Sequence, residues 1–299
     1  MIDRPERSFA LIGAPSSAGA YAPGQEKAPA AFRRHGFAER LGSKGAVIDL
    51  GDVEGFRWRS DRAQPKAMNL DPAARVARAV ADRVAKAMAE RHCAVVLGGD
   101  CSVELGTVAG AMADGANVGL IYIDLDTDLN PPAQSDGALD WTGVAHLLGL
   151  PGTAPALAGL GPRVPMLAPE DLLFFGIDNV TEPEARTIEQ LALGAVRLRE
   201  VKSDPEAAGR RAAAWAQRFD RLLVHLDVDV LSYVDFPIAE NVRRQDGLTL
   251  DELARALGTI LAAPNWRAIT IAEVNPDHAP DEAESFAALI GALCGAVSV

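Results

Sequence analysis

The stretch Gly119-Leu120-Ile121-Tyr122-Ile123-Asp124-Leu125-Asp126-Thr127-Asp128 decides the fold of this chain. Its apolar half is typical of a buried β-strand, and its acidic half follows where that strand would end. A second apolar run, residues 222–226, is followed in the same way by Asp227-Val228-Asp229. Because side chains alternate between the two faces of a strand, these carboxylates are expected to point into a common region. Unpaired ionised carboxylates are costly to bury, so the pattern predicts a pair of divalent metal ions.

Short β-branched or aliphatic runs alternate with Ala-rich stretches of helical periodicity along the chain. This alternation predicts an α/β fold with a mostly parallel central sheet of about eight strands and helices on both faces. The alternation of expected strands and helices continues along the whole sequence, so we expect one domain over residues 1–299. Strands are expected at 8–13, 46–50, 93–97, 118–123, 172–176, 195–198, 222–226 and 268–271. Helices are expected at 29–41, 71–91 (capped by Asp71), 103–112, 182–193, 204–219, 250–262 and 281–297.

Two segments are expected to lie outside this framework. Residues 150–169 are rich in Gly, Pro and Ala and are expected to form a surface excursion. Residues 14–27 follow the first strand and contain Gly19 and Gly24, and they either reach the site or form a plain connecting loop.

The composition is that of an acidic protein without export or membrane signals. Lys and Arg total 29 against 41 Asp and Glu, and the net charge of -12 argues against nucleic acid or an anionic membrane as a partner. Three cysteines are too few for a disulfide framework and indicate a reducing compartment. No run approaches the roughly 20 apolar residues of a membrane span, and no charged segment leads into an apolar stretch at the N-terminus. We therefore expect a cytoplasmic protein.

The turn after residues 93–97 presents a cysteine at the same sheet edge as the carboxylates. Its sequence is Gly98-Gly99-Asp100-Cys101-Ser102, and the two glycines permit a tight connection from strand to helix. A free cysteine is commonly a small buried apolar residue, and we expect that role for Cys93 and Cys294. The position of Cys101 at a strand end favours instead a thiolate that binds metal.

Three motifs in this order resemble the signatures of the arginase (ureohydrolase) superfamily, which are Gly-Gly-Asp-His-Ser, Asp-Ala-His-x-Asp and Ser-x-Asp-x-Asp. The matching stretches are residues 98–102, 124–128 and 225–229. Ile12-Gly13-Ala14-Pro15, Gly247-Leu248-Thr249 and Glu273-Val274-Asn275-Pro276 extend the similarity over nearly the whole chain. The resemblance implies the three-layer arginase-like fold. Deacetylases that act on acylated amines share a similar sheet, but they lack the Gly-Gly-Asp and Glu-Val-Asn-Pro pieces.

The resemblance also implies a centre of two manganese ions, which the family holds between four carboxylates and two histidines. The carboxylates correspond to Asp124, Asp128, Asp227 and Asp229, whereas Cys101 and Asp126 replace the two histidines. With both replacements ionised, excess negative charge would weaken the ions as Lewis acids. Alternatively, Cys101 stays protonated, only one ion binds tightly, or the site is degenerate. Oxygen ligands favour manganese and a thiolate favours zinc or iron, so we expect manganese, with zinc, iron or nickel as alternatives.

The family hydrolyses a guanidino or amidino group, and the resemblance assigns further roles on that basis. Glu273 would orient the cationic planar group, whose N–H fork matches paired carboxylate oxygens. Asp140 occupies the place of the family's proton-carrying histidine, and His146 is the alternative unless it is a helix residue bonded to backbone. His225 replaces the serine of the third motif and is expected to support a metal ligand from behind.

Substrate-binding positions differ from those of enzymes that act on arginine. Asn179 and Thr181 replace carboxylates that engage the amino-acid end of arginine, so arginine itself is not the expected substrate. Glu240, Arg243 and Arg244 lie in a charged loop that is expected to select another compound, such as one bearing a carboxylate. A solvated charged loop without that role is the alternative.

The sequence therefore predicts a metal-dependent hydrolase that cleaves a C–N bond of a small guanidino or amidino compound. The alternative, from another class, is a non-catalytic protein that keeps the fold but has a degenerate metal site. The resemblance further implies a homo-oligomer, either a trimer or a hexamer.

Overall fold

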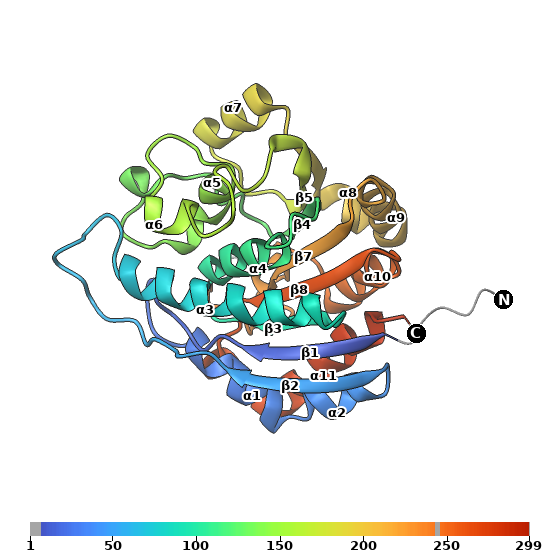
Figure 1. Ribbon diagram of the computed structural model, residues 1–299. Coiled ribbons are helices and arrows are strands. Elements are labelled where there is room, and N and C mark those ends of the chain that lie inside the picture. The colour runs from blue at the N-terminus through green and yellow to red at the C-terminus, as the bar shows by residue number, and fades with distance from the viewer. Residues whose placement is uncertain (1–6, 243–245, 299) are drawn as a thin grey trace.

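The computed structural model describes residues 7–242 and 246–298. At its centre lies one sheet of eight parallel strands in the order β2-β1-β3-β8-β7-β4-β5-β6. Figure 1 shows this sheet between two layers of helices, which confirms the predicted parallel α/β fold. The strands are β1 (Ser8–Gly13), β2 (Ala46–Asp52), β3 (Cys93–Leu97), β4 (Val118–Ile123), β5 (Leu172–Ile177), β6 (Gly194–Arg197), β7 (Arg221–Asp227) and β8 (Trp266–Ala272).

Alternation of side chains within the strands builds two cores, one on each face of the sheet. In β1, Phe9 and Leu11 pack into one core, whereas Ala10 and Ile12 pack into the other. The first core is covered by α1 (Ala28–Arg34), α2 (Phe37–Gly42), α8 (Leu198–Ser203), α9 (Pro205–Ala216), α10 (Leu250–Leu261) and α11 (Glu282–Ala296). The second is covered by α3 (Leu70–Ala89), α4 (Glu104–Ala111), α5 (Gly143–Leu147), α6 (Pro155–Ala158) and α7 (Glu182–Leu191). Burial on both faces explains why the inner strands are continuously apolar.

Several helices begin or end at other residues than the sequence predicts. The helix expected over 29–41 is split into α1 and α2, because Gly36 between them adopts the left-handed conformation with φ 81°. Asn69, rather than Asp71, precedes α3, and Asp71 lies within its first turn. The helix expected over 103–112 begins with a 3-10 turn, Cys101–Val103, before α4 starts. Among the described residues, no helix is long and apolar enough to span a membrane.

The two segments expected outside the framework are both integrated into it. Residues 150–169 contain α6 and fully bury Leu157, Met166 and Leu167, so this segment is not only a surface excursion. Residues 14–27 reach the carboxyl edge of the sheet, where the Gly19 N–H donates a 3.0 Å hydrogen bond to Asp100. The 150–169 segment therefore packs into the second core, and the 14–27 segment reaches the site.

The parallel arrangement brings four connections to one edge of the sheet. β3, β8, β7 and β4 are neighbours at the centre of the sheet. The chain leaves their carboxyl ends at Gly98, Glu273, Val228 and Asp124, respectively. Residues far apart in the sequence are thus placed side by side at the position where parallel sheets commonly bind ligands.

Helix α4, which follows the turn of β3, packs unusually closely against α3. A Cβ atom at Gly106 would lie 2.3 Å from the Ala77 carbonyl oxygen, and one at Gly110 would lie 2.4 Å from that of Ala81. Only glycine permits so close an approach of two helix backbones. The contact therefore fixes the helix that carries Glu104 beneath the site.

Replacing Gly110 by Ala is expected to destabilise the protein by about 1–3 kcal/mol, because the new methyl group must displace the backbone of α3. Gly291→Ala is the matched control, since Gly291 lies inside α11 and a Cβ there would have nothing within 4 Å. That control should be neutral or stabilising by up to about 1 kcal/mol, owing to the better helix propensity of Ala. Denaturation in urea measures both changes, and equal effects of the two substitutions would refute the close-packing argument.

Candidate metal centre

A strongly acidic cavity of about 590 Å³ opens at the carboxyl edge of the sheet. The described residues that line it include no Lys, Arg or His. Tyr21 and Trp141 stand among them as an aromatic pair with ring centroids 4.8 Å apart. The lining residues are Tyr21, Cys101, Asp124, Asp126, Asp128, Asp136, Asp140, Trp141, Asp227, Asp229, Glu240, Asn241, Val242 and Glu273.

Two tight turns with the same hydrogen-bond pattern hold the carboxylates of Asp124 and Asp227. The Asp124 side chain accepts the N–H of Asp126 at 2.7 Å, and the Asp227 side chain accepts the N–H of Asp229, also at 2.7 Å. One oxygen of each carboxylate is thereby fixed to the backbone. The other oxygen of Asp124, Oδ2, is buried and has no hydrogen-bond partner among the described residues. A buried carboxylate oxygen in that state is suited to a cation.

The ligand atoms form two groups that share Asp124. Cys101, Asp124, His225 and Asp227 place one donor atom each within 4.8 Å of one another, and all four residues are buried. Asp124, Asp126 and Asp229 form the second group by the same criterion. Five of the six predicted metal ligands thus come together in these groups. Asp128 lines the cavity but belongs to neither group, and its carboxylate accepts a hydrogen bond from the Tyr122 hydroxyl.

His225, expected only to support a metal ligand from behind, lies within the ligand group itself. It lies two residues before Asp227 on β7, so the period of two turns both side chains to the same face of the strand. Its Nε2 atom is 3.3 Å from Cys101 Sγ. The spacing of His225 and Asp227 along the strand is therefore the sequence signal that indicates a direct contact with the ligand group.

Cys101 lies at the centre of this cluster because the preceding glycines bring the chain close to its neighbours. A Cβ at Gly99 would lie 1.6 Å from the Ser16 carbonyl oxygen. Cys101 Sγ is 3.1 Å from Asp227 Oδ2, and the Cys101 N–H donates to Glu273 Oε1 at 2.9 Å. Burial raises the pKa of the Cys101 thiol well above its usual value, and Asp227 and Glu273 raise it further. A thiolate at this position therefore requires a cation beside it.

Burial and nearby negative charge also raise the pKa values of the carboxyl groups around Cys101. Burial raises the pKa values of Asp124, Asp128 and Asp227 well above the usual value, and the negative charges of neighbouring carboxylates raise them further. The arrangement is thus electrostatically unfavourable without compensating positive charge. The described cavity lining offers no basic side chain for this purpose, so its donor set fits divalent cations.

Glu273 and Asp140 both line the cavity, as the assigned roles require. Glu273 has a left-handed backbone conformation with φ 63°, and its Oε2 accepts a 3.0 Å hydrogen bond from Gln25 in the 14–27 segment. Asp140 is 6% exposed and accepts the Trp141 N–H at 3.0 Å. Burial, followed by the charge of Glu273, raises the pKa of Asp140 well above its usual range. Asp140 therefore keeps its proton more readily than an exposed carboxyl group does.

The structure does not bring His146 to the cavity. The residue is fully buried, its Nδ1 is 2.6 Å from the Thr142 carbonyl oxygen, and its Nε2 accepts the Ala154 N–H at 3.0 Å. Both ring nitrogens are thus occupied by backbone, as in the alternative that the sequence leaves open. The proton-carrying role considered for His146 is not supported, because its ring has no contact with the site.

The predicted substrate-binding residues are divided between the cavity and the surface. Asn179 is exposed and donates a hydrogen bond to the Asp126 carboxylate. Thr181 is also exposed, and its hydroxyl donates at 2.7 Å to Glu184 at the start of α7, so it acts as a helix cap outside the cavity. The cap pattern of Thr181 followed by Glu184 is visible in the sequence. Arg243 and Arg244 lie outside the described residues.

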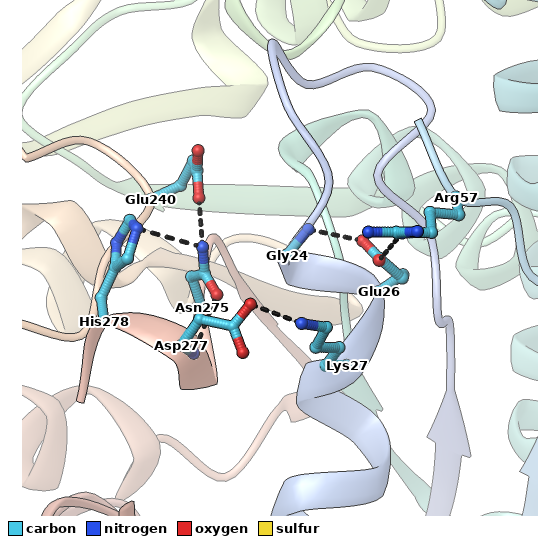
Figure 2. A network of polar contacts seen from close by, with 8 residues as sticks. All are labelled: Gly24, Glu26, Lys27, Arg57, Glu240, Asn275, Asp277 and His278. Atoms are coloured by element: carbon cyan, nitrogen blue, oxygen red, sulfur yellow. Dashed lines mark hydrogen bonds and ion pairs between the residues drawn. The ribbon is translucent and has the colours of Figure 1, made fainter. Parts of the chain in front are cut away.

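Glu240 lines the cavity and joins it to a network of polar contacts, shown in Figure 2. Its Oε2 accepts a 2.6 Å hydrogen bond from Asn275, which lies 3.3 Å from His278. Beside this group, Lys27 and Asp277 form an ion pair that connects the 14–27 segment to the chain after β8. Further contacts in Figure 2 join Gly24, Glu26 and Arg57. The side of the cavity at Glu240 is therefore held by contacts among three separate segments.

Comparison with known proteins identifies relatives over nearly the full length of the chain. The sequence model of the Arginase family matches residues 7–295. The arginase of Bacillus caldovelox is 28% identical over 297 residues, which cover 97% of this chain and 98% of the relative. The crystal structure of the Bacillus cereus arginase superposes with a TM-score of 0.84 at 27% identity, covering 96% and 98% of the two chains. Formiminoglutamase of Trypanosoma cruzi, solved with Mn2+, shares the fold with a TM-score of 0.73 at 19% identity, covering 99% and 94%.

Asp124→Asn is expected to have opposite effects on the metal-free and metal-loaded protein. Without metal, the variant should unfold at a higher temperature than the wild type, because one of the crowded negative charges is removed. With metal, the wild type should gain about 2.7 kcal/mol at a hundredfold excess over Kd, and the variant should gain much less. Thermal unfolding with chelator and with manganese measures both effects. Asp82→Asn, on the exposed face of α3, is the control, and an identical response of the two variants would contradict the metal-centre assignment.

His146→Gln is expected to reduce the acid sensitivity of folding. Burial lowers the pKa of His146, so below a pH of about 6.5 the unfolded chain binds a proton that the folded chain does not. Stability from this group is complete above that pH and declines as the pH falls toward the lowered pKa, by at most about 1.4 kcal/mol per pH unit. Gln can retain one donor and one acceptor for the backbone partners. Urea denaturation between pH 7 and pH 5 should give a smaller slope for the variant than for the wild type, and an unchanged slope would contradict this account.

Proposed function

This chain belongs to the arginase family, and on that premise we propose that it hydrolyses a C–N bond of a cationic guanidino or amidino compound other than arginine. The relatives support a metal-dependent amidino or guanidino hydrolase at the level of the family. The observation that carries the proposal is the acidic cavity, whose buried carboxylates converge from the ends of three neighbouring strands, β8, β7 and β4, with Cys101 following the fourth, β3. Such a cavity attracts a cationic substrate as well as metal ions.

We assign the metal ligands to the two donor groups around Asp124, with Asp128 beside them. Cys101, Asp227 and Asp124 would serve one ion, and Asp124, Asp126 and Asp229 the other. Divalent ions bound there would supply the Lewis acidity that activates water for hydrolysis. The protein's own contribution is to fix each carboxylate through the backbone N–H groups of the two turns.

Glu273 and Asp140 are assigned to the substrate. Glu273 is held from two sides by Gln25 and the Cys101 N–H, which positions its carboxylate toward the planar cation. In the reaction, the oxygen of water forms a bond to the central carbon and the bond from that carbon to the substituted nitrogen breaks. The departing amine needs a proton, and Asp140, whose pKa is raised by burial, can deliver it. The attacking water loses two protons as its oxygen becomes the product carbonyl oxygen: one restores Asp140, and the other completes the ammonium group of the departing amine.

The lining favours a substrate whose second end is cationic or apolar. Asn179 and Thr181 provide no carboxylate for an amino-acid ammonium group, and Thr181 lies outside the cavity. Asp136 and Glu240 add negative charge to the lining, and Tyr21 and Trp141 are 38% and 39% exposed. Aromatic faces bind organic cations through their π electrons. We therefore propose an alkyl guanidine with a cationic or apolar tail, and not the carboxylate-bearing compound that Arg243 and Arg244 suggest in the sequence.

The domain organisation and the compartment are inferred from the sequence and the oligomer from the family resemblance, and all three stay proposals. We propose that residues 1–299 act as one ureohydrolase-like domain in a cytoplasmic homo-oligomer, a trimer or a hexamer. Manganese is proposed for the oxygen-only donor group of Asp124, Asp126 and Asp229, because hard oxygen ligands suit that ion.

Glu273→Gln is expected to lower kcat/KM by about 10- to 100-fold, because a charge-assisted hydrogen bond to the substrate cation is weakened. The measurement is release of urea or ammonia from a panel of guanidino and amidino compounds, with manganese, zinc, nickel and iron supplied in parallel. Glu189→Gln, on the exposed surface of α7, is the control and should retain full activity.

Two outcomes would count against the proposed function. Full activity of the Glu273→Gln variant would remove Glu273 from the site. Absence of turnover with every substrate and metal, together with absence of bound metal, would favour a non-catalytic protein with a degenerate site.

A further inference from the structure

We propose that the two metal subsites are chemically unlike: Cys101, His225, Asp124 and Asp227 form a subsite selective for zinc or ferrous ion, while the oxygen-only subsite takes manganese. In this assignment His225 is a direct ligand and Glu104 is its positioning residue. The inference rests on the proposed function only in requiring that the site binds metal. It concerns which ions bind and through which atoms.

The spacing of the donor atoms supports a single ion between them. His225 Nε2 lies 3.3 Å and Asp227 Oδ2 lies 3.1 Å from Cys101 Sγ. Two ligands of one tetrahedral zinc ion are about 3.5 Å apart when the metal bonds are about 2.0–2.3 Å long. A small outward movement of the side chains is therefore enough to admit the ion. All four residues come from fixed positions at or beside β3, β4 and β7.

The orientation of the His225 ring is a second, independent observation that supports metal binding by this residue. Its far nitrogen, Nδ1, lies 3.5 Å from Oε2 of Glu104, and both residues are buried. Neither that nitrogen nor either Glu104 carboxyl oxygen has a hydrogen-bond partner among the described residues. The 3.5 Å contact is longer than a hydrogen bond, but a small shift of either side chain would let Glu104 accept the Nδ1 proton and leave Nε2 free to bind a metal. Tyr122 stacks on the ring at 4.1 Å between centroids and fixes its plane.

The two donor groups differ in the kind of ion that they prefer. The first contains a thiol sulfur and an imidazole nitrogen, which favour zinc and ferrous ion over manganese. The second contains carboxylates only, which favour manganese or magnesium. His225 also adds a ligand without adding negative charge, because a metal-bound imidazole is neutral. An imidazole from β7 would thus take the part of the one that is missing after β3.

Cys101, His225 and Glu104 could instead form a metal-free nucleophilic group. In that group Glu104 would orient His225, and His225 would deprotonate Cys101. The neighbours of Cys101 argue against this reading. Asp227 and Glu273 both contact the residue, and their negative charges disfavour a free thiolate. A metal ion beside the sulfur removes that conflict, so the metal-bound assignment is preferred.

The test is the absorption spectrum of the full-length protein, stripped of metal and reloaded with one equivalent of cobalt(II). A thiolate ligand should give a sulfur-to-cobalt charge-transfer band in the near ultraviolet. Cys101→Ser should lose this band, whereas Cys294→Ser, a second buried cysteine on α11, should keep it. One equivalent of zinc should displace the cobalt, and one equivalent of manganese should not. Absence of the band in protein that has bound cobalt would overturn the proposal.

Two variants separate the ligand from the residue behind it. Glu104→Gln should keep the charge-transfer band but weaken zinc affinity by about 10- to 100-fold, because the orientation of the imidazole is relaxed. His225→Asn should weaken zinc affinity at least as much and also change the visible cobalt bands, since a ligand is lost. Unchanged zinc affinity in both variants would overturn the assignment of His225.

X-ray absorption at the zinc edge of the wild type needs no substitution and covers the case in which a variant fails to fold. The expected result is a sulfur neighbour at about 2.3 Å and imidazole scattering. A shell of oxygen alone would overturn the proposal. Turnover by chelated protein that iodoacetamide abolishes would instead establish the metal-free cysteine chemistry. A charge-transfer band without hydrolysis of any compound would refute the proposed function alone, whereas hydrolysis with manganese alone and no band would refute this inference alone.

Discussion

Buried carboxylates that share one cavity repel one another, and much of this architecture serves to hold them together. Burial and mutual repulsion both raise the pKa values of Asp124, Asp227 and Glu273. Backbone N–H groups of Asp126, Asp229 and Cys101 bind these carboxylates in turn. The turns are rigid because they leave adjacent strands of a sheet with a packed core on each face. Unfavourable electrostatics in the site are thus offset by packing elsewhere in the molecule.

The sheet is the part of the structure that the sequence predicts best. β3 and β4 have the bounds expected from their apolar runs, because strands buried on both faces admit few polar residues. Helix boundaries depend on single residues and are harder to predict. The break at Gly36 requires a left-handed backbone, and the integration of residues 150–169 depends on buried side chains that a high content of Gly and Pro obscures.

The site is predictable where it depends on strand ends and less so where it depends on individual contacts. The acidic residues and Cys101 follow apolar runs, so their convergence follows from parallel pairing. His225 lies inside such an apolar run, where a polar side chain is easily interpreted as one that only supports a metal ligand. Its spacing of two residues from Asp227 nevertheless indicates that both side chains share one face of the strand. The location of His146 depends on bonds to Thr142 and Ala154, which form only after the chain has folded and leave no periodic pattern in the sequence.

The position of Asp124 in both donor groups makes the two subsites thermodynamically linked. An ion in either subsite would neutralise and orient the carboxylate that the other subsite also uses. Because linkage is reciprocal, the factor by which the first ion changes the affinity of the second must equal the factor in the opposite direction. The identity of the ion in one subsite would therefore tune the affinity of the other, and the two ions would not bind independently.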